Sequence, residues 1–564
     1  MSILKPFLFV VAPLVCSFAQ VAATSEPVKV AVQPPVASVL SPAIPEALAL
    51  YQSGKFEAAV DKYRQTLTAD PKNAAAYVGL TRSLLKEKEV EDARTTIDTA
   101  IHSADSPAVR VALGEVEFRE GSLASAEREW ADVINSGHRE GRAYLGIARV
   151  STALSLHKRA KTMLEKAHAA DPNDAEIRKA WMGTLSRSER IKYLEDYLSK
   201  DNADDEDARA HMHHYLEYLK ARLLESKRGC HLVSKATSTE APLLNLLRDP
   251  QHLRGYGLEV VFGDHKSKLL LDTGAGGILI NRRMAEKAGL KQLSKTTMAG
   301  LGDKGEANGY IALAPSIKVG GLEFQDCPVE VIDRRSVVDE DGLIGSDVFD
   351  KFLVELDFAH QKLRLSELPK RPEQSTQNLS LSPEEDEPNG ADTQSSETQD
   401  KRDATPAAAK PADKGPFDRY ISPEMKNYSQ IIRFGHLLLI PTWVNDDKIA
   451  RFFLIDSGGF TTTMSLNAAK SVTKVHDDPR LHVRGISGET NKVYFADKAT
   501  LRFARLRQPT EDVTVLDLKH LSDSTGTEVS GMIGFTTLRF LDIKIDYRDG
   551  LVFMEYQGPK WMVQ

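Results

Sequence analysis

Two short segments of this sequence repeat one another around an aspartate. Residues 270–274 read Leu-Leu-Asp-Thr-Gly, and residues 454–458 read Leu-Ile-Asp-Ser-Gly. Each is an apolar run, typical of a buried strand, that ends in Asp-Thr/Ser-Gly. The pattern therefore predicts that two equivalent strands each deliver one carboxylate, from Asp272 and Asp456.

The residues that follow the two segments also correspond. A Gly-Leu-Ile-Gly motif ends 73 residues after Asp272, and a Gly-Met-Ile-Gly motif ends 78 residues after Asp456. Twelve residues beyond each motif lies a further aspartate, Asp357 or Asp546, which we interpret as a structural residue at a strand end. Each copy also begins with two β-rich runs around a polar turn, which is typical of a hairpin. Matching flanks in the same order predict that one β-rich domain is present twice.

Two carboxylates contributed by a duplicated pair of domains can act as an acid and a base. Like charges a few ångströms apart cannot both ionise easily, so one carboxyl group keeps a proton. The ionised group can accept a proton from water, while the protonated group donates to a carbonyl oxygen. This chemistry requires no metal ion, and no Cys/His spacing in the sequence is typical of a zinc site. We therefore expect no cofactor.

These motifs resemble those of the retropepsin-like and pepsin-like aspartic proteases, over about residues 250–366 and 431–557. The resemblance implies two lobes in one chain, with Asp272 and Asp456 as catalytic residues that face each other between the lobes. It also implies that an extended peptide or protein substrate lies between them. In such a family the hydroxyl residues of the two motifs hydrogen-bond across the lobe interface, and the glycines permit a tight loop. The residues that would support the dyad are Thr273, Gly274, Ser457 and Gly458.

A glycine-rich stretch follows each aspartate motif at a similar distance. Residues 299–303 read Ala-Gly-Leu-Gly-Asp, and residues 484–488 read Arg-Gly-Ile-Ser-Gly. Such tips between strands suit mobile β-hairpins that close over a substrate. The lid candidates are Gly300, Gly302, Gly485 and Gly488.

The N-terminal part carries a repeat of about 34 residues. Ala59, Ala93, Ala126 and Ala160 are spaced 34, 33 and 34 residues apart, and a large apolar residue follows each by four positions. A small residue lets two helices of a pair approach closely, and the large residue one turn later packs against the next repeat. The pattern resembles the tetratricopeptide repeat and implies an α-solenoid with a groove for a protein partner. A plain helical spacer is the alternative.

The sequence thus predicts a multidomain chain, an α-solenoid followed by two all-β retropepsin-like lobes. Between the lobes lies a Pro-, Glu-, Ser- and Thr-rich stretch with almost no large apolar residues, which cannot form a core. The predicted segments are a signal peptide at 1–23, a flexible leader at 24–42, repeats at 43–174, a helical cap and connector at 175–240, the first lobe at 241–368, a disordered linker at 369–415 and the second lobe at 416–564.

The N-terminus predicts export. Lys5 precedes an apolar run, and small residues surround the candidate cleavage positions Ala19 and Ala23, as in secretory signal peptides. We therefore expect the protein to be periplasmic or secreted. A signal segment that stays uncleaved and anchors the protein in the membrane is the less favoured alternative. No later run of apolar residues is long enough to span a membrane. The net charge of −7 gives no indication of a basic surface that would bind nucleic acid. Cys230 and Cys327 are interpreted as two structural thiols, although a single bridge between them is possible.

Three functional hypotheses remain open. The first is an exported aspartic endopeptidase whose repeats recruit a substrate or partner. The second is a catalytically inactive scaffold whose lobes bind peptides. The third keeps the enzyme but builds each dyad between the chains of a homodimer. In all three, Asp264 and Asp542 are expected to be solvated.

Overall fold

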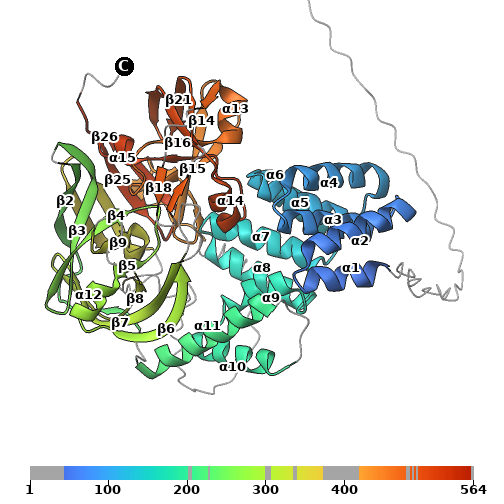
Figure 1. Cartoon of the computed structure of the whole chain (residues 1–564), viewed down its shortest axis with the longest axis horizontal. Helices are drawn as coiled ribbons and strands as arrows, with labels where there is room; N and C mark the ends of the chain where they lie inside the picture. The colour runs from blue at the N-terminus through green and yellow to red at the C-terminus, as the bar shows by residue number, and fades with distance from the viewer. Residues whose placement is uncertain are drawn as a thin grey trace, which may run out of the picture. The chain divides into compact units, whose positions relative to one another are not determined.

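The structure is a computed structural model of the chain, whose course can be followed in Figure 1. It describes residues 43–200, 206–225, 229–249, 251–298, 307–333, 340–371, 381, 418–477, 483–485, 488–490 and 493–559. The predicted signal peptide and leader, most of the predicted linker, and two of the lid candidates, Gly300 and Gly302, lie outside the described residues.

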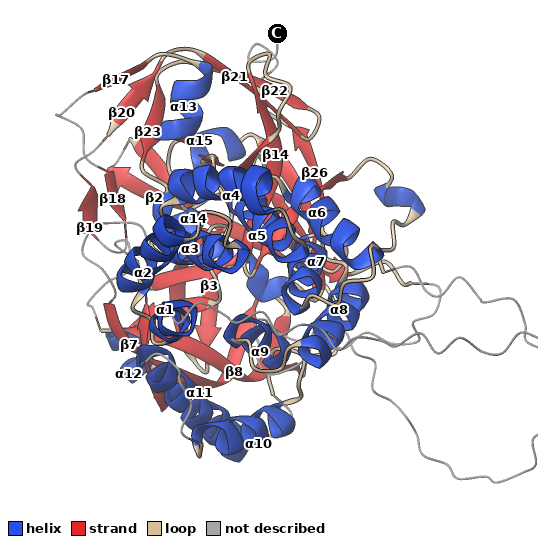
Figure 2. Ribbon diagram, turned by 90° about the vertical axis from the view of Figure 1, so that its right-hand side faces the viewer, coloured by secondary structure: helices blue, strands red, loops and turns tan. Residues whose placement is uncertain are grey.

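Paired helices make up the N-terminal part of the described chain, and Figure 2 distinguishes them from the strands. The four spaced alanines lie on α2, α4, α6 and α8, the second helix of each pair, where they are buried. The predicted repeat register is therefore confirmed. The helices are α1 (Ala43–Gln52), α2 (Phe56–Ala69), α3 (Ala74–Lys86), α4 (Val90–Ala104), α5 (Pro107–Arg119), α6 (Leu123–Asn135), α7 (Gly141–Ala153), α8 (His157–Ala170), α9 (Ala175–Met182), α10 (Arg187–Leu198) and α11 (Glu206–Glu225).

Trp130 shows how the large residue of a repeat fills the space between helix pairs. Its ring lies against Gly114 of α5 and Gly146 of α7, where a Cβ on either glycine would overlap the indole. The indole Nε1 donates a hydrogen bond to the carbonyl oxygen of Val111 (3.0 Å). Small residues facing a large one thus allow the close packing that a solenoid needs.

Strands dominate the chain after α11 and form two lobes of matching order. The first lobe contains β1 (His231–Leu232), β2 (Thr239–Asp249), β3 (His252–Phe262), β4 (His265–Asp272), β5 (Ile278–Asn281), α12 (Arg282–Lys287), β6 (Lys291–Met298), β7 (Ala307–Val319), β8 (Leu322–Ile332), β9 (Gly342–Gly345), η1 (Ser346–Phe349), β10 (Phe352–Asp357) and β11 (Lys362–Glu367).

The second lobe repeats much of this order. It contains η2 (Pro423–Met425), β12 (Ser429–Gln430), β13 (Ile432–Phe434), β14 (Leu437–Val444), β15 (Arg451–Ile455), β16 (Thr463–Ser465), α13 (Leu466–Val472), β17 (Val475–Asp477), β18 (Val483–Gly485), β19 (Gly488–Thr490), β20 (Tyr494–Ala496), β21 (Ala499–Phe503), β22 (Leu506–Thr510), β23 (Val513–Leu516), α14 (Lys519–Thr525), β24 (Gly531–Ile533), α15 (Phe535–Leu538), β25 (Leu541–Asp546) and β26 (Leu551–Tyr556).

The two Gly-x-x-Gly motifs occupy the same place in each lobe. In the first lobe, β9 lies between β4, which it pairs in parallel, and β5, which it pairs antiparallel. In the second, β24 lies in the same way between β15 and β16. A Cβ at Gly342 would overlap the carbonyl oxygen of Leu279, and one at Gly534 would overlap Thr461. The motifs need glycine at these positions because Gly342 packs against the backbone of β5 and Gly534 packs against the backbone of Thr461, after the Asp456 loop.

One sheet joins the two lobes within a single chain. Strand β10 of the first lobe pairs antiparallel with β25 of the second, in the strand order β12-β26-β25-β10-β11-β2. Asp357 ends β10 and is paired with Arg364 (3.2 Å), while Asp546 ends β25 and accepts the N–H of Asp549 (3.0 Å). Both are buried structural residues, as the sequence predicts.

The solenoid and the second lobe share one hydrophobic core. Phe118 of α5 lies 6.1 Å, centroid to centroid, from both Trp130 of α6 and Phe434 of β13. The core includes residues of β15 and β24, the strands beneath the Asp456 loop. Its buried members in the second lobe are Ile432, Leu437, Leu439, Leu454, Val493, Leu516, Leu518, Val529 and Met532.

Polar contacts surround this shared core. Thr527 Oγ1 donates to the carbonyl oxygen of Phe118 (2.6 Å), and Arg119 pairs with Asp523 of α14. Asp418 accepts the backbone N–H groups of Lys158 and Arg159 (2.8 and 2.7 Å) at the N-terminus of α8. A carboxylate there satisfies free amides and complements the helix dipole.

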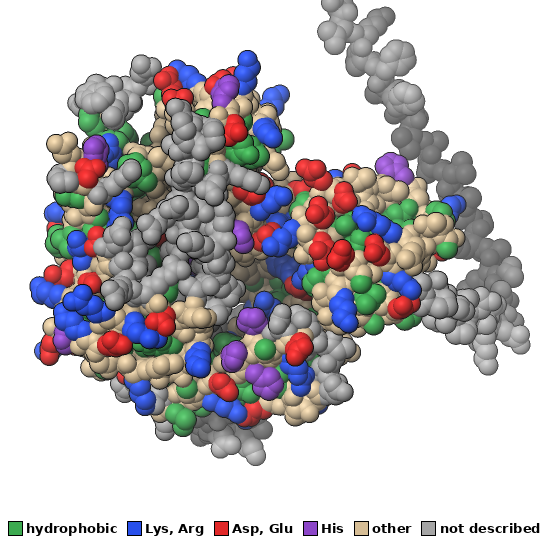
Figure 3. All heavy atoms as spheres, viewed as in Figure 1, with side chains coloured by type: hydrophobic (Ala, Val, Ile, Leu, Met, Phe, Trp, Pro, Cys, Tyr) green, Lys and Arg blue, Asp and Glu red, His purple; other side chains and the backbone are tan. Residues whose placement is uncertain are grey.

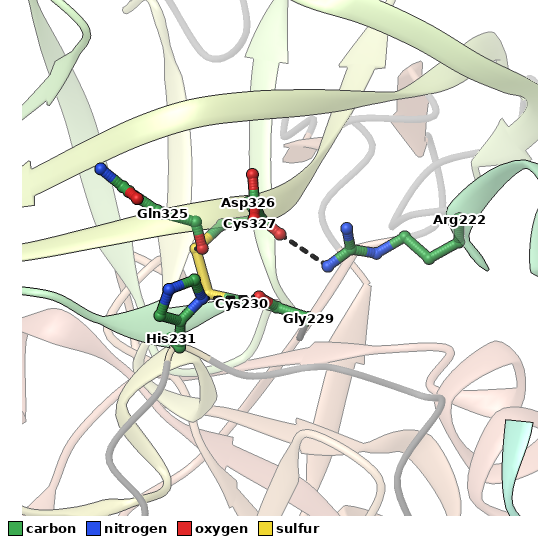
Figure 4. The surroundings of a disulfide bond; sticks show 7 residues. All are labelled: Arg222, Gly229, Cys230, His231, Gln325, Asp326 and Cys327. Carbon is green, nitrogen blue, oxygen red and sulfur yellow. Dashed lines mark hydrogen bonds between the residues drawn. A yellow bond between two sulfur atoms is a disulfide. The ribbon is translucent and has the colours of Figure 1, made fainter. Parts of the chain in front are cut away.

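The two cysteines form a disulfide, so the interpretation as two thiols is wrong. Figure 4 shows the bridge between the start of β1 and β8. Strand β1 pairs antiparallel with β8 through His231 and Gln325, which brings Cys230 beside Cys327. Arg222 of α11 donates to the carbonyl oxygen of Asp326 next to the bridge (2.6 Å). The disulfide therefore ties the connector after α11 to the first lobe.

Asp542 is buried rather than solvated, so that expectation is also wrong, whereas Asp264 is exposed. Asp542 lies on β25 directly opposite Asp357 on β10, and only 9% of it is exposed. Burial, followed by the charge of Glu355, raises the pKa of Asp542 to about 6. The register of a sheet that joins two lobes, rather than local sequence, places this carboxyl group.

Figure 3 shows the charges on one face of the molecule. Asp and Glu side chains gather over part of the described helical region, with Lys and Arg side chains among them. The described part of this face therefore has no continuous basic stripe of the kind that tracks a phosphate backbone.

The shared core predicts that the solenoid and the second lobe unfold together. Phe118→Ala should lower stability by roughly 3–5 kcal/mol, the usual cost of emptying a buried phenylalanine site. Thermal unfolding should show the same shift in the far-ultraviolet circular dichroism of the helices and in cleavage of the second lobe by an added protease. Leu224→Ala, at a site that is 85% exposed, is the control. A shift confined to the helical signal would contradict a shared core.

Asp542→Asn should stabilise the protein at alkaline pH. The folded pKa of about 6 lies above the ordinary value near 3.9. Folding therefore favours the protonated form, and that contribution is lost as the pH rises through about 6. Because one pKa unit corresponds to about 1.4 kcal/mol and the site is partly hydrated, we expect a gain on the order of 1 kcal/mol at pH 8.

The gain should shrink steadily as the pH falls toward 4, where the carboxyl group is protonated in the folded state and about half protonated in the unfolded state. Urea unfolding between pH 4 and pH 8 measures it, with Asp264→Asn at an exposed turn as the control. A gain that does not depend on pH would rule out ionisation as its cause.

Candidate active site

The two motif aspartates lie at equivalent strand ends, and the backbone of each loop turns back onto its own carboxylate. Asp272 ends β4, and its Oδ1 accepts the N–H of Gly274 (2.9 Å). Asp456 follows β15, and its Oδ1 accepts the N–H groups of Gly458 (3.0 Å) and Gly459 (2.9 Å). The loops thus hold both carboxyl groups in fixed orientations.

Each motif glycine faces the aspartate of the other lobe. A Cβ at Gly274 would lie 2.8 Å from Asp456 Oδ1 and 3.4 Å from Asp272 Oδ1, and one at Gly458 would overlap the carboxyl group of Asp272. The two carboxyl groups also interact by a side-chain hydrogen bond. Any side chain at either glycine would push the aspartates apart.

Thr273 and Ser457 exchange four hydrogen bonds across the lobes. Thr273 Oγ1 donates to the carbonyl oxygen of Ile455 (2.7 Å) and accepts the N–H of Ser457 (2.9 Å). Ser457 Oγ donates to the carbonyl oxygen of Leu271 (2.8 Å) and accepts the N–H of Thr273 (3.0 Å). Both residues are buried, so each hydroxyl satisfies two backbone groups that water does not reach.

The surroundings of the two carboxyl groups favour one shared proton. Burial, followed by the charge of Asp456, raises the pKa of Asp272 well above its usual range. Burial also raises the pKa of Asp456, but the amides of Gly459 and Gly458 and the hydrogen bond from Asp272 oppose that rise. The hydrogen bond between the two carboxyl groups raises the pKa of Asp272 and lowers that of Asp456, so the ionised form is better stabilised at Asp456.

The lid candidates in the second lobe lie on a small hairpin. Gly485 ends β18 and pairs with Gly488, which begins β19, in a two-stranded sheet. In the first lobe, β6 and β7 pair as a hairpin up to Met298 and Ala307. Gly300 and Gly302 fall between these two residues and outside the described part of the chain.

Sequence reasoning missed two residues beside the dyad. The carboxylate of Asp347 accepts the N–H of Gly277 at the end of the Asp272 loop (3.1 and 3.3 Å). The ring of His436, in the turn between β13 and β14, lies against Gly276, where a Cβ would be 2.7 Å from Nδ1. The position of Asp347 two residues after the Gly-Leu-Ile-Gly motif was the available signal for the first. His436 belongs to the other lobe, and its motif gives no sign of this contact.

Two further properties of the described residues concern metal binding and membrane insertion. No cluster of histidine, cysteine, aspartate and glutamate suited to hold a metal ion occurs among them. None of the helices that the structure describes is both long and apolar enough to cross a membrane.

Comparisons with known proteins agree with the two kinds of fold. Residues 258–348 match the family model described as aspartyl protease, and residues 50–113 match a tetratricopeptide repeat model. No curated protein matches the chain. The fold is thus a solenoid of tetratricopeptide repeats followed by two β lobes of the aspartic protease type.

Two solved structures are similar to parts of the chain. The aspartic proteinase from Irpex lacteus is 12% identical with a TM-score of 0.33, over 57% of this chain and 97% of that chain. A structure described as a functional characterization of Pseudomonas aeruginosa pilF is 19% identical with a TM-score of 0.24, over 33% of this chain and 84% of that chain.

The cross-lobe hydrogen bonds predict a measurable cost for removing one hydroxyl. Thr273→Val leaves the N–H of Ser457 and the carbonyl of Ile455 without a partner in a buried site, which should cost roughly 1–3 kcal/mol. Thr461→Val is the matched control, because its hydroxyl is exposed and has a 3.4 Å contact with Thr514. Urea unfolding should separate the two variants. Equal midpoints would show that the cross-lobe hydrogen bonds do not stabilise the pair of lobes.

Proposed function

We propose that the protein is an aspartic endopeptidase that hydrolyses peptide bonds by activating water between Asp272 and Asp456. The observation that carries this proposal is the contact of two carboxyl groups, each at the end of an equivalent strand, across two lobes of one chain. The aspartyl protease match of residues 258–348 supports the same reaction class. A dyad completed within one chain disfavours the hypothesis of dyads built between two chains.

The reaction follows from the shared proton. Ionised Asp456 accepts a proton from a water molecule, and the oxygen of that water attacks the carbonyl carbon of the scissile bond. Protonated Asp272 donates its proton to the carbonyl oxygen, which gives a neutral tetrahedral diol. Asp456 then donates its new proton to the amide nitrogen, the C–N bond breaks, and Asp272 recovers a proton from the diol. The two carboxyl groups thus end the cycle as they began it.

The substrate in this proposal is a peptide or an extended segment of a protein. The hairpins β6–β7 and β18–β19 are the elements that would close over it. Phe460, four residues after Asp456 in the sequence, is a large apolar side chain that is 43% exposed, and it favours an apolar group on the substrate.

The repeats are proposed to bind a protein partner or the substrate itself. Their tetratricopeptide character supports this role. The surfaces of α5, α6 and α7 that pack on the second lobe are not available for it. Charged pairs between helices also use polar side chains within the solenoid, such as Arg82 with Glu115 and Arg142 with Asp174.

Export to the periplasm or the exterior is the proposed location. The signal-like N-terminus motivates it, and the disulfide between Cys230 and Cys327 supports it, because such bridges persist in oxidising compartments.

Substitution of either aspartate should abolish cleavage. Asp272→Asn and Asp456→Asn each remove one proton-transfer group and should lower kcat/KM by at least about a thousand-fold. Peptide-library cleavage from pH 3 to pH 8, with and without a transition-state mimic such as pepstatin, measures the effect. Asp264→Asn should cleave like the wild type, and circular dichroism should confirm that all variants fold.

The outcomes separate the remaining hypotheses. Near-wild-type cleavage by either asparagine variant would overturn the paired mechanism. A wild-type protein that binds peptides without cleaving them would be the inactive scaffold instead.

A further inference from the structure

We propose that Asp347 is a positioning residue that holds the catalytic loop of the first lobe through its hydrogen bonds to the Gly277 amide, an inference that rests on the proposed peptidase function. Asp347 does not touch the reacting atoms. It acts through the backbone of the loop that carries Asp272.

Asp347 lies where it can fix the end of that loop. It belongs to η1, directly after β9, and only 4% of it is exposed. Both of its carboxyl oxygens accept the N–H of Gly277, at 3.1 and 3.3 Å. Gly277 has a φ of +67°, a conformation that glycine adopts without strain. The carboxylate therefore stabilises a backbone turn that few other residues could form.

The same segment also fixes the start of the loop. Asp272 pairs with Gly345 in the parallel register of β4 and β9, and the N–H of Gly345 donates to the carbonyl oxygen of Gly277 (2.8 Å). A Cβ at Gly345 would overlap both Asp347 Oδ1 and the carbonyl oxygen of Ala275. Glycine is needed there because the carboxylate and the loop meet directly above it. Residues 345–347 thus hold both ends of the loop.

The second lobe holds its loop by neutral groups. The residue in the corresponding position, two after the Gly-Met-Ile-Gly motif, is Thr536. The loop is held instead by Thr462 Oγ1, which accepts the N–H of Gly534 (3.2 Å) and hydrogen-bonds with Thr537 Oγ1 (2.8 Å). Among the contacts of the described residues, an ionisable side chain thus holds the loop of Asp272 and neutral hydroxyls hold the loop of Asp456.

Groups from both lobes surround Asp347 and influence its charge. Arg433 of β13 pairs with Asp350 (3.3 Å) and lies over the ring of Tyr547, whose hydroxyl hydrogen-bonds with Ser346. Burial raises the pKa of Asp347 to about 7, the Gly277 amide and Arg433 oppose that rise, and Asp350 adds to it.

The other charged or titratable groups near this cluster interact with Arg433 or with Asp350. Lys351 Nζ lies 3.5 Å from Asp350 Oδ1. The positive charge of Arg433 acts on His436 and on His157 of α8. Burial, with Arg433 second, lowers the pKa of each histidine, so both stay neutral near pH 7. Asp347 is therefore the group among these whose charge changes around neutral pH.

The test compares Asp347→Ala with Asp347→Asn. Alanine removes the acceptor for Gly277, whereas asparagine keeps an oxygen acceptor of the same size without the charge. Rates are expressed per active site, counted by titration with a tight-binding transition-state mimic, so that loss of folded protein does not count. Asp347→Ala should lower kcat at least about ten-fold with little change in KM, and Asp347→Asn should recover most of it.

The pH profile gives the second measurement. The carboxylate is a stronger acceptor for the Gly277 amide than the neutral acid. Wild-type kcat should therefore rise as the pH passes about 7, by less than the loss seen in Asp347→Ala, and Asp347→Asn should lack this rise. Thr536→Ala, at the corresponding position of the second lobe, should keep the wild-type rate and profile. Wild-type kcat per active site in Asp347→Ala, or an unchanged profile in Asp347→Asn, would overturn the positioning role.

Failure of the proposed function gives a different result. If the wild type cleaves no peptide, hydrogen–deuterium exchange of a fragment that spans residues 272–277 still tests the contact. Exchange at least about ten-fold faster in Asp347→Ala, and near the wild-type rate in Asp347→Asn, would support it. Equal exchange in all three proteins would overturn it.

Discussion

The geometry of the site depends on the four hydrogen bonds that Thr273 and Ser457 exchange across the lobes. Each hydroxyl bonds to backbone groups of the opposite lobe, so the two loops cannot shift independently. That constraint brings two carboxyl groups together although their burial and mutual repulsion oppose it. The sheet formed by β10 and β25 adds a second connection between the lobes, and the four hydrogen bonds set the alignment of the two loops.

The solenoid also restrains the Asp456 loop, because it packs against the strands beneath that loop. Leu454 and Met532, on the strands beneath the Asp456 loop, pack in one core with Phe118 and Trp130 of the repeats. The strands that support the Asp456 loop are thus covered on one side by helices of the repeat region. The repeats therefore support the strands beneath the Asp456 loop through packed side chains.

The parts that the sequence predicted depend on local or periodic signals. The repeat register follows from alanines about 34 residues apart, and the paired strands follow from duplicated motifs with matching flanks. The parts that it missed depend on pairing between distant segments. Cys230 meets Cys327 because β1 joins β8, and Asp542 is buried because β25 joins β10. Neither pairing leaves a trace in the residues around these positions. The contact of His436 with Gly276 likewise arises only when the lobes meet.

Duplication gave the two lobes one arrangement of strands, but the residues that hold the two loops have diverged. A carboxylate holds the loop of Asp272, and threonine hydroxyls hold the loop of Asp456. Burial raises the pKa of both aspartates, but the hydrogen bond between the two carboxyl groups raises the pKa of Asp272 and lowers that of Asp456. A symmetric pair would give neither aspartate a preference for the proton. The unequal surroundings favour ionised Asp456 beside protonated Asp272, and acid–base catalysis requires that the two carboxyl groups differ in this way.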